Sequence, residues 1–266
     1  MKKFTIFGNP VEHSKSPQMH NAGFRHINFD GDYDKTFLKD GSTIKEVFLQ
    51  QNLSGANITV PHKENAYAKA DVVEGIASII GAVNTYILKG NKIYGYNTDA
   101  PGFLKAIEEY GNIKNVLILG AGGTARALAV AFKDKNIPVS VINRSENRLE
   151  FFDTLGLTTY TWESFSLAAN KFDLIVNTTS AGLKDDKLPC PEILLNAILK
   201  NSKYAVDCIY GKQTPFLQKA QKYNLKFKDG EDMLLYQGVL AFELFTGVKA
   251  DKQLIEAMRY GLKNNS

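Results

Sequence analysis

The chain switches repeatedly between the hydrophobic periods of β-strands and of α-helices. In the first hundred residues, short apolar or alternating segments predict strands at residues 5–8, 35–38, 57–60, 83–88 and 92–96. The sequence Lys89-Gly90-Asn91 predicts a turn between the last two strands. This part of the chain is therefore expected to form a sheet that ends in a hairpin.

A second series of elements begins near residue 115. Strands are predicted at residues 116–119, 139–142, 174–177 and 204–207, and a helix over residues 124–135. The helix carries Ala125, Leu128, Ala129 and Phe132 on one apolar face. Strand, glycine turn, helix and strand make a βαβ unit, which predicts a right-handed crossover in a parallel sheet. The apolar region from about 236 to 260 predicts a helical end to the chain.

The composition excludes several classes of protein. The 266 residues are 44% hydrophobic, and 32 Lys and Arg against 28 Asp and Glu give a net charge of +4, without long runs of one sign. This mild excess favours small anionic ligands and not nucleic acid. No apolar stretch approaches the roughly 18 residues of a membrane span, and the N-terminal segment is too short for a signal peptide, so a cytoplasmic protein is expected. Cys190 and Cys208 lack the spacing of a metal or disulfide framework.

A glycine-rich turn joins the second series of strands to its first helix. The segment Gly120-Ala121-Gly122-Gly123-Thr124-Ala125 follows a Val-Leu-Ile-Leu run and matches the G-x-G-x-x-G/A pattern. Gly120 permits a tight turn, Gly122 lets the backbone approach a pyrophosphate, and Ala125 lets the helix pack on the strand. A flexible turn would explain an isolated glycine motif, but the strand-turn-helix setting favours dinucleotide binding.

The segment after the next strand favours NADP over NAD. Asn143-Arg144-Ser145 stands where NAD-binding proteins usually carry an acidic residue. A guanidinium can pair with a 2′-phosphate, which a carboxylate would repel. Arg126 and Arg148 are further candidates for this phosphate, although a solvated helix face is the commoner position of a lone arginine. Thr178, in the segment 177–182 after the third strand, is a candidate to line the nicotinamide half, and a plain turn is the alternative.

Polar residues at the starts of predicted helices suggest a site for an acidic substrate. Ser16 and Pro17 are placed as N-cap and first residue of a helix, and capping alone would explain them. Together with Ser14, however, Ser16 could bind a carboxylate. Lys63 follows the strand segment Asn-Ile-Thr-Val-Pro-His, in a first helical turn whose positive end disfavours the ammonium form and so suits proton exchange near neutrality. Asp99 is either a partner in such chemistry or a helix cap.

Taken together, these motifs resemble the shikimate dehydrogenases over essentially the whole chain. They are Ser-x-Ser-Pro, Asn-x-Thr-Val-Pro-His-Lys, Ala-Val-Asn-Thr, Asn-Thr-Asp, the glycine turn, Asn-Arg-Ser, Asn-Thr-Thr-Ser-Ala-Gly and Tyr-Gln-Gly, in that order. The resemblance implies an α/β fold of two domains, with the active site in the cleft between them. Residues 1–101, completed by helices at about 237–266, would bind the substrate, and residues 102–236 would form a Rossmann-like NADP-binding domain. The implied activity is the NADPH-dependent, reversible reduction of 3-dehydroshikimate to shikimate in chorismate and aromatic amino acid biosynthesis.

The resemblance also implies a role for each matching residue. Lys63 and Asp99 would form the catalytic pair. The substrate would be bound by Ser14, Ser16, Thr59, Lys63, Asn84, Asp99, Tyr210 and Gln237. The cofactor would be bound by Gly120, Ala121, Gly122, Gly123, Thr124, Ala125, Asn143, Arg144, Ser145, Arg148, Thr178, Gly230 and Met233. The family usually has Pro where this chain has Lys212, which weakens the assignment of Tyr210.

Two other functions remain open at this point. A quinate or broader shikimate/quinate dehydrogenase would share the scaffold, although the Asn-Arg-Ser segment argues against its NAD-dependent form. A non-catalytic NADP-binding regulator would be expected to lack Lys63 or Asp99, and both are present. The sequence leaves the oligomeric state open, with a homodimer as one candidate, and predicts neither a nucleic-acid nor a membrane partner.

Overall fold

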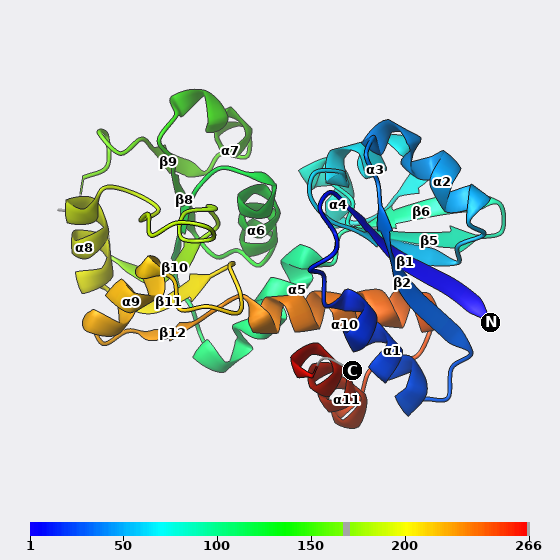
Figure 1. Ribbon diagram of the computed structural model, residues 1–266. Helices are drawn as coiled ribbons and strands as arrows, with labels where there is room; N and C mark the ends of the chain where they lie inside the picture. Colours follow the sequence, from blue (N-terminus) through cyan, green and yellow to red (C-terminus); the bar gives the residue numbers. More distant parts are fainter. Residues whose placement is uncertain (167–170, 265–266) are drawn as a thin grey trace. The chain divides into compact units, whose positions relative to one another are not determined.

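The computed structural model describes residues 1–166 and 171–264. The chain divides into two compact units (Figure 1). The first unit consists of Met1–Gly102 and Leu234–Ser266, and the second of Phe103–Met233. The first unit is thus built from both ends of the chain, and the second from one continuous stretch.

The first unit contains a mixed six-stranded sheet with the order β2-β1-β3-β5-β6-β4. Strands β1, β2 and β3 pair in parallel, whereas β5 is antiparallel to β3 and β6. The strands are β1 (Lys2–Gly8), β2 (Gly31–Phe37), β3 (Gly55–Ile58), β4 (Val72–Val73), β5 (Thr85–Lys89) and β6 (Lys92–Tyr96). The helical elements up to the second unit are α1 (Ser16–His26), η1 (Gly41–Thr43), α2 (Ile44–Gln50), α3 (Lys63–Lys69), α4 (Ile76–Ile80) and α5 (Asp99–Ala106).

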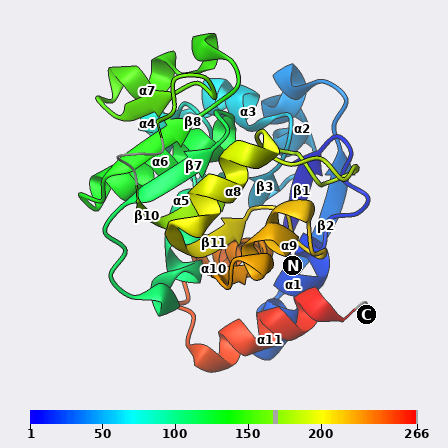
Figure 2. The ribbon, with the colours of Figure 1, turned by 90° about the vertical axis from the view of Figure 1, so that its left-hand side faces the viewer.

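Hydrophobic residues cover both faces of this sheet. Along β1, Phe4 and Ile6 belong to one apolar cluster and Phe7 to another, as the alternation of side chains along a strand requires. The first cluster is completed by α10 (Glu231–Thr246) and α11 (Lys252–Lys263). Helices α1 and α11 lie side by side (Figures 1 and 2). The C-terminal helices therefore supply half of the core beneath the N-terminal sheet.

The second unit contains an entirely parallel sheet with the order β12-β11-β10-β7-β8-β9. Its strands are β7 (Val116–Leu119), β8 (Val139–Ile142), β9 (Thr158–Tyr160), β10 (Phe172–Asn177), β11 (Ser202–Asp207) and β12 (Lys226–Lys228). Its helical elements are η2 (Glu108–Tyr110), α6 (Gly123–Asp134), η3 (Glu146–Arg148), α7 (Glu150–Thr154), α8 (Glu192–Lys200) and α9 (Pro215–Lys222). Val116 and Ile118 face one apolar cluster and Leu117 and Leu119 the other. The predicted α/β class with a parallel sheet is confirmed.

Differences from the predicted elements occur at sheet edges and at the C-terminus. Strands β4, β9 and β12 were not predicted, because two or three residues are too few to show a period. The predicted C-terminal helical region is two helices, since Gly247 adopts a left-handed conformation at φ 76° and Asp251 caps α11. Within the described residues, no helix is long and apolar enough to cross a membrane.

Gly102 lies where α5 passes directly against α10. A Cβ atom at this position would lie 2.5 Å from the backbone nitrogen of Gln237. We expect Gly102→Ala to force the two helices apart and to lower the free energy of unfolding by about 1–3 kcal/mol. Thermal or denaturant unfolding measures this loss. The exposed neighbour on the same helix supplies the control, since Pro101→Ala should have a smaller effect, and equal effects of the two substitutions would refute the close-packing argument.

Candidate active site

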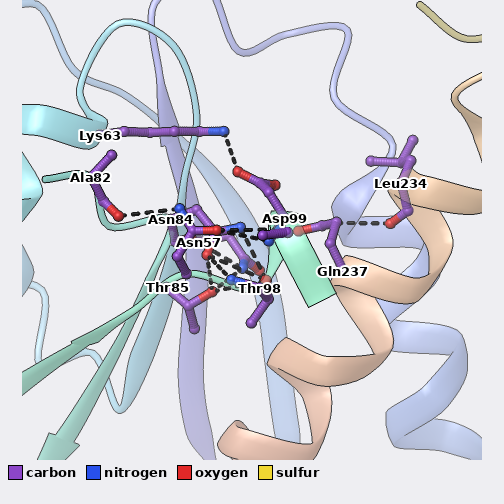
Figure 3. A network of polar contacts seen from close by, with 11 residues as sticks. Asn57, Lys63, Ala82, Asn84, Thr85, Thr98, Asp99, Leu234 and Gln237 are labelled. Carbon is purple, nitrogen blue, oxygen red and sulfur yellow. Dashed lines mark hydrogen bonds and ion pairs between the residues drawn. The ribbon is translucent and has the colours of Figure 1, made fainter. Parts of the chain in front are cut away.

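A lysine and an aspartate from the first turns of two different helices meet in the first unit. Lys63 is the first residue of α3, which follows β3 after a turn containing a cis peptide bond before Pro61. Asp99 is the first residue of α5, which follows β6. The Lys63 Nζ and an Asp99 carboxylate oxygen lie 2.6 Å apart, and the two side chains are 27% and 15% exposed (Figure 3). The pair is therefore charge-assisted, partly desolvated and still open to a ligand.

Asp99 is not used as a helix cap. The side-chain oxygen of Asn97 accepts hydrogen bonds from the backbone N–H groups of Asp99 and Ala100, at 3.1 and 3.4 Å. Asn97 thus satisfies the first donors of α5. The sequence left two roles open for Asp99, and the structure favours the pairing with Lys63.

Asn84 lies beside this pair in a dense polar network. Its side-chain oxygen accepts hydrogen bonds from the Thr98 backbone N–H at 2.8 Å and the Thr85 hydroxyl at 2.9 Å, and its amide nitrogen donates to the Thr98 hydroxyl at 3.0 Å (Figure 3). Asn84 is 2% exposed. Gln237, on α10, donates from its amide to the Leu234 carbonyl at 2.8 Å. These contacts fix both amides in orientation.

The two candidate serines lie together at the start of α1. The prediction that Ser16 is the N-cap is wrong: α1 begins at Ser16 itself, and Lys15 occupies the N-cap position without a side-chain hydrogen bond. The reason is that the Ser14 hydroxyl oxygen accepts the Ser16 N–H at 3.3 Å, which starts the helix earlier. The Ser14 hydroxyl also donates to the Ser16 hydroxyl at 3.2 Å. The hydroxyl pair is thus preserved, with Ser16 almost fully buried.

The glycine turn borders a cavity of about 580 Å³ in the second unit. The cavity lies at the carboxyl ends of the strands, where ligands bind in open parallel sheets. It is lined by Gly120, Ala121, Gly122, Ile142, Asn143, Arg144, Arg148, Trp162, Thr178, Thr179, Ser180, Ala181, Asp185, Lys187, Leu188 and Pro189. Gly120 has φ 106°, and a Cβ on Gly122 would point into open space. The chain therefore leaves room for a group close to the backbone, as a dinucleotide requires.

Two arginines give this cavity a positive rim. Arg144 follows β8 and Arg148 ends η3, and no acidic residue follows β8 directly. Arg126 is placed differently from the expectation, because its guanidinium stacks on the Phe151 ring at 5.1 Å and it does not line the cavity. Trp162 and Lys187 line the cavity but were not predicted. The position of Trp162 just after strand β9 could have indicated it, but β9 is an edge strand too short to be predicted from the sequence.

The remaining candidates for cofactor binding lie around this cavity or on neighbouring elements of the second unit. Gly123 and Thr124 form the first turn of α6, and Ala125 is fully buried beneath it. The Ser145 carbonyl accepts a hydrogen bond from the Asn143 amide at 2.9 Å. A Cβ on Gly230 would lie 2.4 Å from the Cys208 carbonyl oxygen, so only glycine fits there. Met233 packs on the core of the unit, and Tyr210, assigned to the substrate, is 36% exposed.

A buried carboxylate supports the loop that follows β10. Asp207 accepts hydrogen bonds from the Thr214 hydroxyl at 2.6 Å and the Asn177 amide at 3.1 Å, and burial raises its pKa. Asn177 in turn accepts from the backbone and the hydroxyl of Thr179. The cavity wall formed by residues 177–182 is thus anchored to β11 as well as to β10.

Comparison with known proteins decides the family. Residues 6–86 match a model described as the shikimate dehydrogenase substrate binding domain, and residues 230–259 match a shikimate 5′-dehydrogenase C-terminal domain. A shikimate dehydrogenase (NADP(+)) from Helicobacter hepaticus is 46% identical over 257 residues, which cover 96% of this chain and 95% of that protein. The chain belongs to the shikimate dehydrogenase family. A Helicobacter pylori relative of the same name, from strain 26695, is 45% identical over 92% of this chain and 93% of its own length.

Solved structures of family members have the same fold. A shikimate 5-dehydrogenase from Thermus thermophilus, in complex with NADP(H) and shikimate, has a TM-score of 0.85 at 35% identity and covers 98% of this chain and 100% of its own. A shikimate dehydrogenase from Aquifex aeolicus has a TM-score of 0.85 at 33% identity, with 99% and 98% of the two chains covered. The family predicted from the sequence motifs is therefore confirmed.

Proposed function

We propose that this chain catalyses the NADP-dependent, reversible reduction of 3-dehydroshikimate to shikimate. The observation that carries the proposal is the Lys63–Asp99 pair, whose charged atoms lie 2.6 Å apart. The pair lies in the first unit, and residues 6–86 of this unit match the family's substrate-binding domain. The names of the relatives and the complex of the Thermus thermophilus protein with NADP(H) and shikimate support the substrate and the cofactor. This reaction serves the biosynthesis of chorismate and the aromatic amino acids.

The chemical step needs a proton donor beside the reacting oxygen. When bound, NADPH supplies the hydride that reduces the carbonyl at carbon 3. Negative charge then develops on the carbonyl oxygen, and the Lys63 ammonium stabilises this charge and donates the proton. Asp99 holds the ammonium in position through the 2.6 Å contact. In the alternative assignment, Asp99 carries the proton and Lys63 only stabilises the charge.

The remaining polar residues would bind and orient the substrate ring. We assign the substrate carboxylate to Ser14 and Ser16, whose hydroxyls lie 3.2 Å apart at the start of α1. The ring hydroxyls are assigned to Asn84, Asp99, Thr59, Gln237 and, more weakly, Tyr210. The amides of Asn84 and Gln237 are already oriented by hydrogen bonds, so binding costs little conformational entropy there.

NADP fits the cavity of the second unit. The glycine turn and the start of α6 would hold the pyrophosphate with backbone N–H groups, and Arg144 and Arg148 would pair with the 2′-phosphate. Residues 143–145 would contact the adenosine half of the cofactor, and Thr178 would contact the nicotinamide half. Gly230 and Met233 are also assigned to the nicotinamide. We assign the enzyme to the cytoplasm, a reducing compartment in which cysteines such as Cys190 and Cys208 stay as thiols.

A substrate and cofactor matrix tests the proposed function. The purified chain is offered shikimate or quinate, each with NADP or NAD, and the near-ultraviolet absorbance of the reduced nicotinamide is followed. Turnover of shikimate with NADP well above the other combinations is expected. Equal turnover of quinate would show a broader dehydrogenase, and no turnover in any combination would refute catalysis in favour of a binding protein.

Trp162 should report cofactor binding directly. It is the only tryptophan of the chain and lines the cavity beside Arg144. Because a ligand in this cavity would contact the indole, we expect saturating NADP to quench the tryptophan fluorescence, and NADPH to add energy transfer to its nicotinamide. Shikimate alone should leave the emission unchanged, since Ser14 and Asp99 belong to the other unit. Unchanged emission at saturating NADP would place the cofactor elsewhere.

A further inference from the structure

Asn97 lies between β6 and α5 and has no role in the substrate and cofactor assignments above. It is buried, so its amide group depends on hydrogen bonds within the protein. Its side-chain oxygen accepts the N–H groups of Asp99 and Ala100, and its nitrogen donates to the Ala82 carbonyl at 3.1 Å. A helix cap needs only the oxygen. The bond from the nitrogen therefore does more than start α5.

The carbonyl that Asn97 binds belongs to a peptide group that also holds the backbone of Lys63. This group joins Ala82 to Val83, and both residues are buried. Its carbonyl accepts from Asn97, and its N–H, on Val83, donates to the Lys63 carbonyl at 3.0 Å. A peptide group is planar and rigid. The backbone of Lys63 and the side chain of Asn97 are therefore bonded to opposite sides of one fixed group.

The residue between Asn97 and Asp99 is held separately. The Thr98 N–H donates to the Asn84 side-chain oxygen at 2.8 Å, and Figure 3 shows Thr98 and Asn84 beside Asp99. Loss of the Asn97 contacts would therefore leave the segment attached at Thr98. It would free the first turn of α5 to move about that point, and Asp99 is the first residue of this turn. The 2.6 Å contact with Lys63 would lengthen, because the Asp99 backbone would no longer be fixed.

We propose that Asn97 is a positioning residue that fixes the Asp99 carboxylate against the Lys63 ammonium through the shared peptide group. This inference rests on the proposed function for the reaction that the pair performs. The lysine side chain is a flexible stem, so the position of its ammonium depends on the carboxylate that holds it. A small displacement of that carboxylate moves the proton donor away from the reacting oxygen, and such displacements are costly in rate.

The test keeps the helix cap and removes the link to the peptide group. Serine caps a helix about as well as asparagine, but its side chain is too short to contact the Asp99 N–H and the Ala82 carbonyl together. We expect Asn97→Ser to lower kcat for shikimate oxidation about 10- to 100-fold, with the dissociation constant for NADP unchanged. Steady-state kinetics and calorimetry on the same variant measure the two quantities.

The matched control is Asn115→Ser in the second unit. The Asn115 side chain also bridges two backbone groups, since its oxygen accepts the Asp173 N–H and its nitrogen donates to the Lys171 carbonyl, both at 2.8 Å. It precedes β7, at the end of the sheet opposite the cavity. We expect Asn115→Ser to lower stability but to leave kcat within about twofold of the unaltered chain.

A double-mutant cycle separates positioning from a loss of folded enzyme. If Asn97 acts through the Asp99 carboxylate, then Asn97→Ser should change kcat less than about twofold when Asp99→Ala is already present. A merely structural effect would lower kcat by the same factor in both backgrounds. An undiminished effect of Asn97→Ser in the Asp99→Ala background would overturn the proposal, as would a normal kcat in the single variant.

Two further arrangements keep the result decisive. If Asn97→Ser does not fold, Asn97→Asp replaces it, because the carboxylate has the same size and accepts the same N–H groups but cannot donate to Ala82. Crystal structures of the unaltered chain and the variant give the distance between the Lys63 Nζ and the Asp99 carboxylate. We expect it to exceed about 3.5 Å in the variant, and an unchanged contact would overturn the proposal. Absent turnover by the unaltered chain would refute the proposed activity, while this distance would still decide whether Asn97 positions Asp99.

Discussion

Replacing Lys63 by methionine is expected to lower kcat by about 10²–10⁴ while the dissociation constant for shikimate changes little. The reason is that the ammonium acts mainly on charge that develops in the transition state, and methionine retains the apolar stem. Steady-state kinetics gives kcat, and calorimetry gives the affinity of the same variant.

A second lysine on the same helix provides the control for this experiment. Lys69 lies in the last turn of α3, and Lys69→Met should leave kcat nearly unchanged. Near-normal turnover of Lys63→Met would reject the catalytic role. Lost shikimate affinity with preserved turnover would make Lys63 a binding residue.

Replacing Arg144 by alanine is expected to weaken NADP binding roughly 10- to 150-fold and to leave NAD binding almost unaltered. The variant removes a charge-assisted pair with the 2′-phosphate, worth about 1.5–3 kcal/mol, and NAD has no such phosphate. Arg144 is exposed on the wall of the cavity, so truncation should not disturb the core. Titration of both cofactors, followed by Trp162 fluorescence or calorimetry, measures the two affinities.

Arg126→Ala serves as the comparison, because Arg126 carries the same charge but stacks on Phe151 away from the cavity wall. We expect Arg126→Ala to weaken NADP and NAD binding by similar factors, both smaller than the loss of NADP affinity in Arg144→Ala. An equal loss of NADP and NAD affinity in Arg144→Ala would show that Arg144 supports the fold and does not select the phosphate.

The fold was predictable where the hydrophobic pattern is long and regular. The strands at 116–119 and 139–142 agree with β7 and β8, and the helix predicted at 124–135 differs from α6 by one residue at each end. These elements are buried on both faces or carry a full apolar stripe, so tertiary structure and local preference agree. The short edge strands depend instead on the neighbours with which they pair.

The candidate site was predictable as a set of residue types but not as a set of contacts. Sequence reasoning could not decide whether Asp99 caps a helix or pairs with Lys63, because Asn97 stands two residues earlier and competes for the cap. It likewise placed Ser16 as a cap, although Ser14 accepts that N–H group. Trp162 was missed because it reaches the cavity through neighbours that are distant in sequence, and no local motif marks such a contact.

The division of the first unit between the two ends of the chain has a consequence for synthesis on the ribosome. Strand β1 emerges before the second unit, whereas α10, whose Phe245 and Phe242 rings pack on Phe4 and Phe24 at 4.8 and 5.1 Å, emerges only at the end of that unit or after it. The second unit, Phe103–Met233, emerges whole in between. Since domains fold as units once their whole sequence has been synthesised, we expect the second unit to fold before the first. Until α10 and α11 have been synthesised, the N-terminal segment keeps an exposed apolar surface that chaperones can bind.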